Sequence, residues 1–87
     1  MAEVLITLKI MPDDASVNIE AIMKSIKRID VARLNKIEEE PVAFGIVALK
    51  TSFVARDEGG AAEKIENSLK NIDGIGSVEV VETTRLL

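Results

Sequence analysis

Three consecutive carboxylates, Glu38–Glu40, are the side chains of this sequence best suited to bind a hard cation. Oxygen ligands of this kind hold Mg²⁺ or Ca²⁺ when they converge on one point. Successive side chains of an extended segment point to opposite sides, so these three carboxylates converge poorly on a single ion. We therefore interpret them as part of a solvated loop, with an acidic edge for docking a partner as the alternative.

The sequence offers few other side chains or motifs that could react or bind a ligand. The chain has no cysteine and no histidine, which excludes disulfides, thiolate or imidazole metal sites, and catalysis by either side chain. Gly59-Gly60 could hold an anion at a helix N-terminus, but Asp57-Glu58 would repel phosphate and the P-loop pattern is missing, so we predict a plain turn. Hydrolysis by two facing carboxylates needs a cleft that a small fold rarely provides. We expect no enzyme activity, no metal and no cofactor.

Phe44 is the residue whose position folding explains least well. It is one of only two aromatic residues, and it lies between Ala43 and Gly45 in a predicted turn after Pro41. One interpretation is a core aromatic side chain. The other is an exposed anchor that inserts into a pocket of a partner, as binding hot spots do. Gly45 would let the chain turn sharply and present the ring.

Length and composition limit the fold and the partners. The 87 residues suit one domain, 1–87, and 47% hydrophobic with 30% charged residues is typical of a folded protein. A net charge of −4 disfavours binding to nucleic acid or to anionic membranes. No window approaches the ~18 apolar residues of a membrane span, and no signal peptide is evident. We expect a cytoplasmic protein without direct nucleic-acid or membrane contact.

The hydrophobic pattern predicts four strands and two helices. Alternation with a period of two predicts strands over residues 3–11, 31–37, 43 or 46–54, and from 78 towards 85, the second of them at a sheet edge because it is charged. Spacing of three and four predicts amphipathic helices at Ile19–Ile29, with Asn18 as N-cap, and at Ala62–Ile72. Pro12-Asp13-Asp14 ends the first strand, and the segment Asn71 to Ser77, which carries Gly74 and Gly76, breaks the second helix.

The order β-α-β-β-α-β predicts an α+β fold of the ferredoxin-like type. Two split βαβ units would make a four-stranded antiparallel sheet with both helices on one face. Right-handed crossovers would place the first and third strands at the centre of the sheet. These two strands have the strongest alternation, so pattern and topology agree.

Several segments have a specific order and spacing: Lys9-Ile10-Met11-Pro12, residues 36–49, Glu58-Gly59-Gly60, and Val78-Glu79-Val80 with the Arg85-Leu86 ending. In these segments the sequence resembles the archaeal translation elongation factor 1-beta family of guanine-nucleotide exchange factors. The resemblance covers essentially the whole chain, and its specific part is the Pro-x-x-Phe-Gly block. It implies a ferredoxin-like domain that promotes GDP release and GTP loading on elongation factor 1-alpha. This GTPase delivers aminoacyl-tRNA to the ribosome.

The resemblance also implies a partner-binding site. Phe44 matches the family aromatic that inserts into the nucleotide-binding domain of the GTPase, and Ala43 and Gly45 flank it as the family motif requires. Eukaryotic members place a lysine next to last, aimed at the Mg²⁺ region of the GTPase. This chain departs there, because Leu86 is next to last and Arg85 precedes it. We expect these two residues to form the second contact.

A different function class stays open from the residues alone. Small-molecule-binding regulatory modules use the same ferredoxin-like fold and usually pair through their sheets or strand edges. Such a module would dimerise and gain thermal stability from an amino acid or a similar ligand, whereas an exchange factor would do neither.

Overall fold

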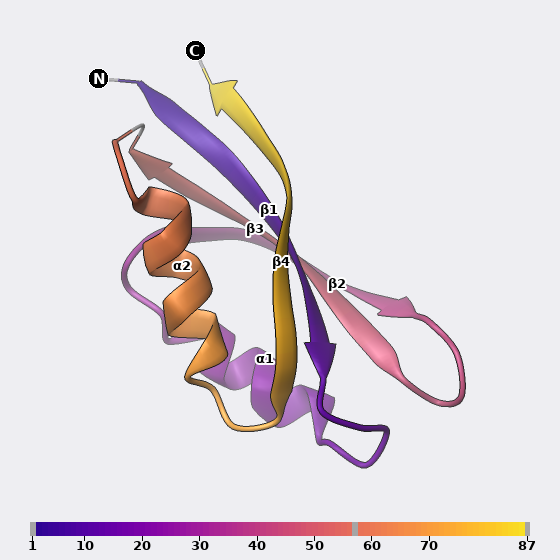
Figure 1. The fold of residues 1–87 in the computed structure, drawn as a ribbon. Helices are drawn as coiled ribbons and strands as arrows, with labels where there is room; N and C mark the ends of the chain where they lie inside the picture. Colours follow the sequence, from indigo (N-terminus) through magenta and orange to yellow (C-terminus); the bar gives the residue numbers. More distant parts are fainter. Residues whose placement is uncertain (1, 57, 87) are drawn as a thin grey trace.

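The elements follow the predicted order along the chain (Figure 1). The computed structural model describes residues 2–56 and 58–86. Its elements are β1 (Glu3–Pro12), α1 (Ile19–Lys27), β2 (Arg33–Pro41), β3 (Val47–Arg56), α2 (Ala61–Lys70) and β4 (Ile75–Leu86). Neither helix in this part of the chain is long and apolar enough to cross a membrane.

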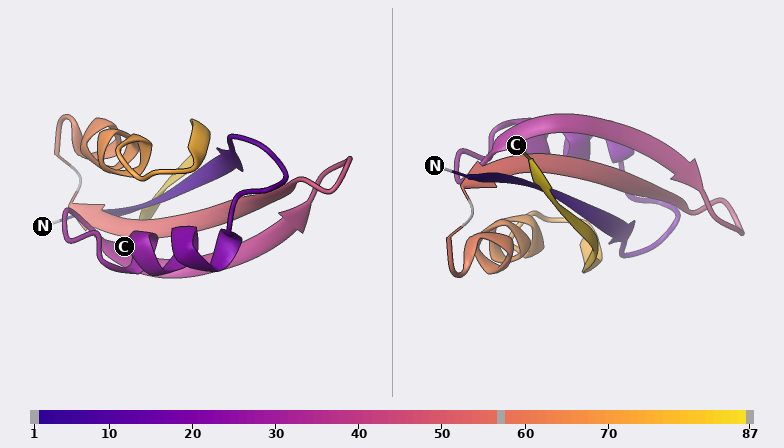
Figure 2. Two further views of the ribbon diagram at one scale, coloured as in Figure 1. Left: turned by 90° about the horizontal axis from the view of Figure 1, so that it is seen from below. Right: turned by 90° about the horizontal axis from the view of Figure 1, so that it is seen from above.

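The sheet has the strand order β2-β3-β1-β4, and every neighbouring pair is antiparallel. The first and third strands lie at the centre, and the charged β2 lies at an edge, as the sequence predicts. Both helices lie on one side of the sheet, and its other side is open (Figure 2). The predicted ferredoxin-like α+β sandwich is therefore confirmed.

Alternate residues of the central strands form the core. Phe53 of β3 is fully buried, and the core residues of β1 are at most 7% exposed. The buried cluster contains Val4, Ile6, Leu8, Ile10, Leu49 and Phe53 from the central strands, and Ile22, Ile26, Ile65 and Leu69 from the helices. Each such side chain stabilises the fold by about 1.5–3 kcal/mol when buried. The central strands are thereby held as a firm support for the β2–β3 hairpin.

Helix α1 is shorter than the apolar pattern predicts. The side chain of Asn18 accepts a hydrogen bond from the amide of Ala21 at 3.2 Å, so the predicted N-cap is confirmed. The helix ends at Lys27 rather than at Ile29. The amide of Ile29 donates to the carbonyl of Ile26 in a tighter final turn, and its side chain still packs against the core.

Helix α2 follows directly on a glycine turn. Gly60 has a φ of 88°, and no side chain caps the helix. The amide of Ala61 donates to the carbonyl of Glu58, so Gly59 and Gly60 form the predicted turn. Asp57, which the prediction included in this turn, lies outside the described residues.

Strand β4 begins at Ile75, earlier than the predicted start at Val78. The prediction was wrong because β1 supplies this segment with a ladder partner, Pro12, which pairs with Ile75. A Cβ at Gly76 would lie 3.1 Å from the carbonyl oxygen of Pro12. Glycine therefore permits a close approach of two backbones at a position where its presence suggested a break.

Candidate partner-binding site

The β2–β3 turn presents Phe44 at the end of a hairpin. The amide of Ile46 donates to the carbonyl of Ala43 at 2.9 Å, which closes a four-residue turn. The central residues Phe44 and Gly45 have φ values of 56° and 79°. Positive φ at both central positions is the pattern of a type I′ turn, whose twist matches that of the two flanking strands. The turn predicted around Phe44 is confirmed.

Folding leaves the side chain of Phe44 exposed to solvent. Its side chain is 96% exposed, whereas Phe53, the other phenylalanine of the sequence, is fully buried. Within the described residues Phe44 is also the one non-glycine residue with positive φ, a conformation that costs an L-residue about 1–2 kcal/mol. An exposed ring forgoes about 1.5–3 kcal/mol of burial energy. The core interpretation of Phe44 is therefore wrong, and an anchor for a partner is favoured.

The neighbours of Phe44 extend the exposed apolar surface. Ala43 is exposed and Val42 is 49% exposed. Gly45 needs its positive φ, and a Cβ at this position would lie 3.8 Å from the Cβ of Ala15. The loop between β1 and α1 therefore lies close to Gly45 in the Phe44 turn.

The carboxylates Glu38–Glu40 belong to strand β2 and not to a loop. The strand continues to Pro41, which pairs with Val47 at the start of β3. The loop prediction was wrong because the backbone ladder with β3 persists although every side chain of this stretch is exposed. Three consecutive carboxylates still suit an edge strand, because their charge discourages pairing with a further strand.

The strand geometry separates the three carboxylates. Glu38 and Glu40 lie on the open face of the sheet, where Lys36 is 3.2 Å from Glu38 and Lys9 is 3.7 Å from Glu40. Glu39 points to the opposite side, because successive strand residues alternate. Within residues 2–56 and 58–86, no group of three acidic, histidine or cysteine residues could hold a metal ion.

The last residues of β4, Arg85 and Leu86, belong to the strand end that lies at the opposite end of the sheet from the β2–β3 turn (Figure 1). The β1–β4 ladder pairs them with Val4 and Glu3, at the start of β1. The β2–β3 turn lies beyond the other end of β1, and the described residues extend 42 Å along their longest axis. The structure thus does not bring the two predicted contact groups together. A partner that touches both would reach along most of the molecule.

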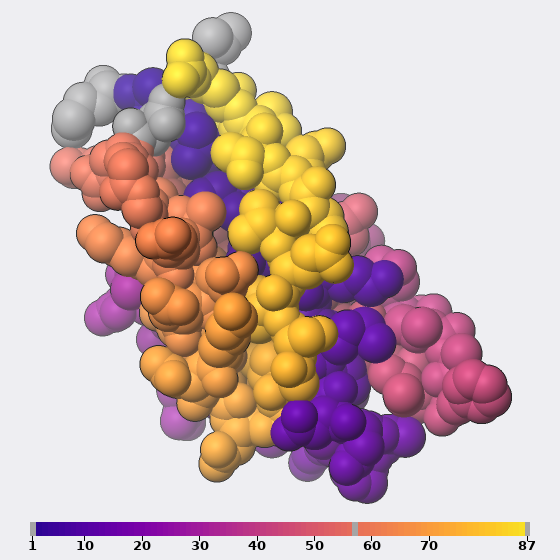
Figure 3. Space-filling view, viewed as in Figure 1, coloured from indigo at the N-terminus to yellow at the C-terminus, as the bar shows by residue number. Residues whose placement is uncertain are grey.

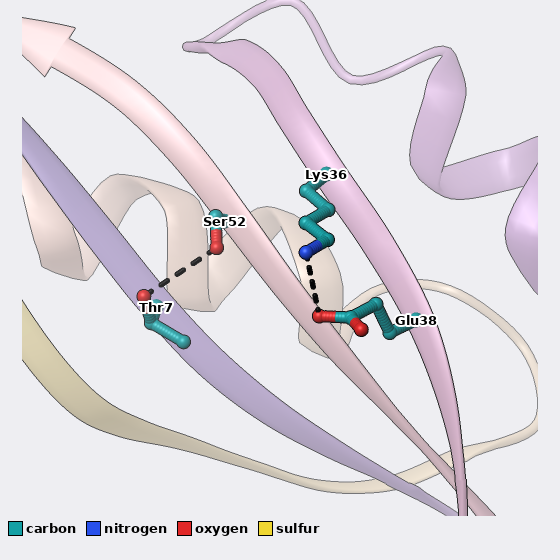
Figure 4. Close-up of polar contacts among 4 residues, drawn as sticks. All are labelled: Thr7, Lys36, Glu38 and Ser52. Carbon is teal, nitrogen blue, oxygen red and sulfur yellow. Dashed lines mark hydrogen bonds and ion pairs between the residues drawn. The ribbon is translucent and has the colours of Figure 1, made fainter.

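The open face of the sheet holds a hollow of about 480 Å³ that the sequence did not predict. The hydroxyl groups of Thr7 and Ser52 lie 3.4 Å apart on the central strands, and Lys36 pairs with Glu38 beside them (Figure 4). These groups satisfy one another, so the hollow offers a polar surface rather than an activated nucleophile. Its sequence signal is the polar face of β1, where Thr7 and Lys9 alternate with core residues.

Comparison with known proteins gives a consistent family. Residues 5–86 match a family described as the EF-1 guanine nucleotide exchange domain. The chain is 43% identical to elongation factor 1-beta of Methanothermobacter thermautotrophicus and 42% identical to that of Methanobrevibacter smithii, over the full length of each chain. It is 32% identical to elongation factor 1-beta of Thermoplasma acidophilum, covering 90% of this chain and 91% of the relative.

A solved structure supports the fold independently. The solution structure of the C-terminal domain of the MgtC protein from Mycobacterium tuberculosis superposes with a TM-score of 0.56. The match covers 98% of this chain and 88% of that domain, at 13% sequence identity. At this identity the likeness concerns the fold alone.

Proposed function

The chain belongs to the family of EF-1 guanine nucleotide exchange domains, and we propose that it promotes GDP release from, and GTP loading onto, translation elongation factor 1-alpha. Membership supports a nucleotide-exchange role in translation elongation, and it favours this role over the small-molecule regulatory module. In the proposal, residues 1–87 act as a single exchange domain in the cytoplasm. They carry out no covalent chemistry and do not contact nucleic acid or membrane directly.

The observation that carries the proposal is the exposed ring of Phe44. A large apolar side chain that is 96% exposed on a hydrogen-bonded hairpin is suited to fill a pocket of another protein. The ring needs no ionisable neighbour, because its task is to bind the GTPase rather than to react. Truncating a side chain of this kind typically costs at least about 2 kcal/mol of binding free energy, which is about 30-fold in affinity.

Exchange then follows from the linkage of two binding equilibria. A factor that binds the nucleotide-free GTPase more tightly than the GDP-bound form must weaken GDP binding by the same factor. The ring of Phe44 would achieve this by entering the nucleotide-binding domain and disturbing the contacts to phosphate and Mg²⁺. GDP leaves faster, and GTP takes its place.

Arg85 and Leu86 form the second contact in this proposal. Pairing with the start of β1 fixes their backbone at the far end of the sheet, where Arg85 is exposed and Leu86 is half-buried. A guanidinium group binds phosphate and carboxylate oxygens through two parallel hydrogen bonds, which a lysine ammonium does not offer. The arginine of this chain would therefore contact the GTPase with a different geometry from the lysine of eukaryotic members.

The experiment that tests the proposal follows labelled GDP on purified elongation factor 1-alpha. We expect the chain to accelerate GDP release in the presence of excess unlabelled nucleotide, with a rate that rises with its concentration and then saturates. A release rate that does not change at any concentration of the chain would overturn the proposal.

A further inference from the structure

The β1–α1 loop, residues 13–18, lies beside the Phe44 turn at one end of the molecule (Figure 3). The amide of Asp13 donates to the carbonyl of Gly74 at 2.8 Å, which fixes the start of the loop. We use the name tip for the exposed residues of the loop and the turn together. They are Asp13, Asp14, Ala15, Ser16, Val42, Ala43, Phe44 and Gly45.

The charged residues of the tip itself are acidic. They are Asp13 and Asp14, whereas the carboxylates of Glu38 and Glu40 on β2 are paired with Lys36 and Lys9 at 3.2 and 3.7 Å. The amide and the hydroxyl of Ser16 donate to Asp14 at 2.8 and 2.5 Å. These hydrogen bonds lower the pKa of Asp14 below its ordinary value, and the bond from the hydroxyl has the larger effect. Asp13 and Asp14 therefore give the surface around Phe44 a negative edge.

The arginines gather at the opposite end of the molecule. β-ladder pairing places Arg56 and Arg85 beside the first two residues of β1, and Arg33 lies at the adjoining start of β2. Arg28 caps the end of α1 that leads into β2. These are all the arginines of the sequence. Charge is thus segregated along the long axis, with an acidic and apolar tip at one end and the arginines at the other.

We propose that the β1–α1 loop is a second part of the partner-binding surface at this tip, and that it faces a basic rim around the partner pocket that receives Phe44. The inference rests on the proposed function and assigns the β1–α1 loop to the surface around Phe44. Exposed charges contribute mainly orientation and association rate, because solvent and salt screen them. The ring of Phe44 supplies most of the binding free energy, and Asp13 and Asp14 set the orientation in which the two proteins approach each other.

The test changes the charge at Ala15, an exposed residue that follows the two aspartates in the chain and lies near Gly45 of the turn. Ala15→Lys and Ala15→Glu place side chains of similar reach and opposite charge at the same point. Asn67→Lys and Asn67→Glu make the same changes of net charge on the exposed surface of α2. Association of each variant with nucleotide-free elongation factor 1-alpha is measured by stopped flow at low and high salt, after circular dichroism has confirmed an unchanged fold.

We expect Ala15→Lys to slow association at least about threefold at low salt relative to Ala15→Glu, and the difference to shrink at high salt. The two Asn67 variants should differ much less. Asp13→Asn, which removes one charge without changing shape, should slow association in the same direction. Equal slowing by both Ala15 variants would overturn the basic rim, and no effect of either would overturn the role of the loop.

These outcomes are separate from failure of the proposed function. A wild-type chain that neither binds the GTPase nor accelerates GDP release would refute the function itself. A wild-type chain that accelerates release, with Ala15 variants that behave like the Asn67 controls, would refute only the inference about the loop.

Discussion

Phe44 and Phe53 are the same side chain in opposite environments, nine residues apart on one hairpin. Phe53 is fully buried in the core, and Phe44 is 96% exposed in a backbone conformation that L-residues avoid. For Phe53, burial accounts for the choice of residue. For Phe44, neither burial nor backbone preference accounts for the choice of residue, and this is the basis for proposing that the ring binds a partner.

This contrast predicts opposite effects on stability. Phe53→Ala should lower the free energy of unfolding by about 3–5 kcal/mol, because it leaves a cavity between the sheet and the helices. Phe44→Ala should change it by less than about 1 kcal/mol, since an exposed ring contributes little. Urea denaturation followed by circular dichroism measures both variants. A loss above ~3 kcal/mol for Phe44→Ala would contradict the exposed position of the ring.

The alternation of apolar and polar residues predicted the strands that have one buried and one exposed face. It did not predict the strand segments that form only because a neighbouring strand offers a backbone partner. The first and third strands could be predicted because every second residue enters the core. The acidic end of β2 and the first residues of β4, Ile75 to Ser77, could not be predicted, because their local sequence suggests loops. Both segments become strands only because β3 and β1 provide backbone partners.

The α2–β4 connection offers a test of a glycine that the fold requires. Gly74 has a φ of 93°, and a Cβ there would lie 2.8 Å from Cγ1 of Val17. Gly74→Ala should therefore destabilise the chain by about 1–3 kcal/mol, through strain and overlap together. Gly59→Ala is the matched control, because a Cβ at that position meets nothing within 4 Å. A denaturation midpoint for Gly74→Ala equal to that of Gly59→Ala would contradict this account of the turn.

For the whole molecule, the order and direction of the strands in the sheet set how far apart the predicted contact residues lie. The Phe-Gly pair was enough to predict a turn, but it left open whether the ring of Phe44 is buried or exposed. The separation of Phe44 from Arg85 and Leu86 could not be predicted from their sequence neighbours, because it depends on which ends of β1 the hairpin and β4 adjoin. The positive φ of Phe44 was equally invisible, since phenylalanine rarely adopts it.

This separation predicts independent contributions to binding. Phe44→Ala and Arg85→Ala should each weaken binding to nucleotide-free elongation factor 1-alpha. In the double variant their free-energy costs should add to within about 0.5 kcal/mol, because distant sites without shared partners do not couple. Isothermal titration calorimetry of the four proteins gives the cycle. A coupling energy well above ~1 kcal/mol would show that the two ends act on one partner element.

In the proposed mechanism, the exposed ring of Phe44 drives nucleotide exchange without contributing to the fold. The most direct measurement compares wild-type chain with Phe44→Ala in the release of labelled GDP from elongation factor 1-alpha, over a full range of concentrations. We expect Phe44→Ala to lower the exchange efficiency at least about 30-fold, while its unfolding transition stays close to that of the wild type. Equal GDP release by a folded Phe44→Ala variant would contradict this mechanism.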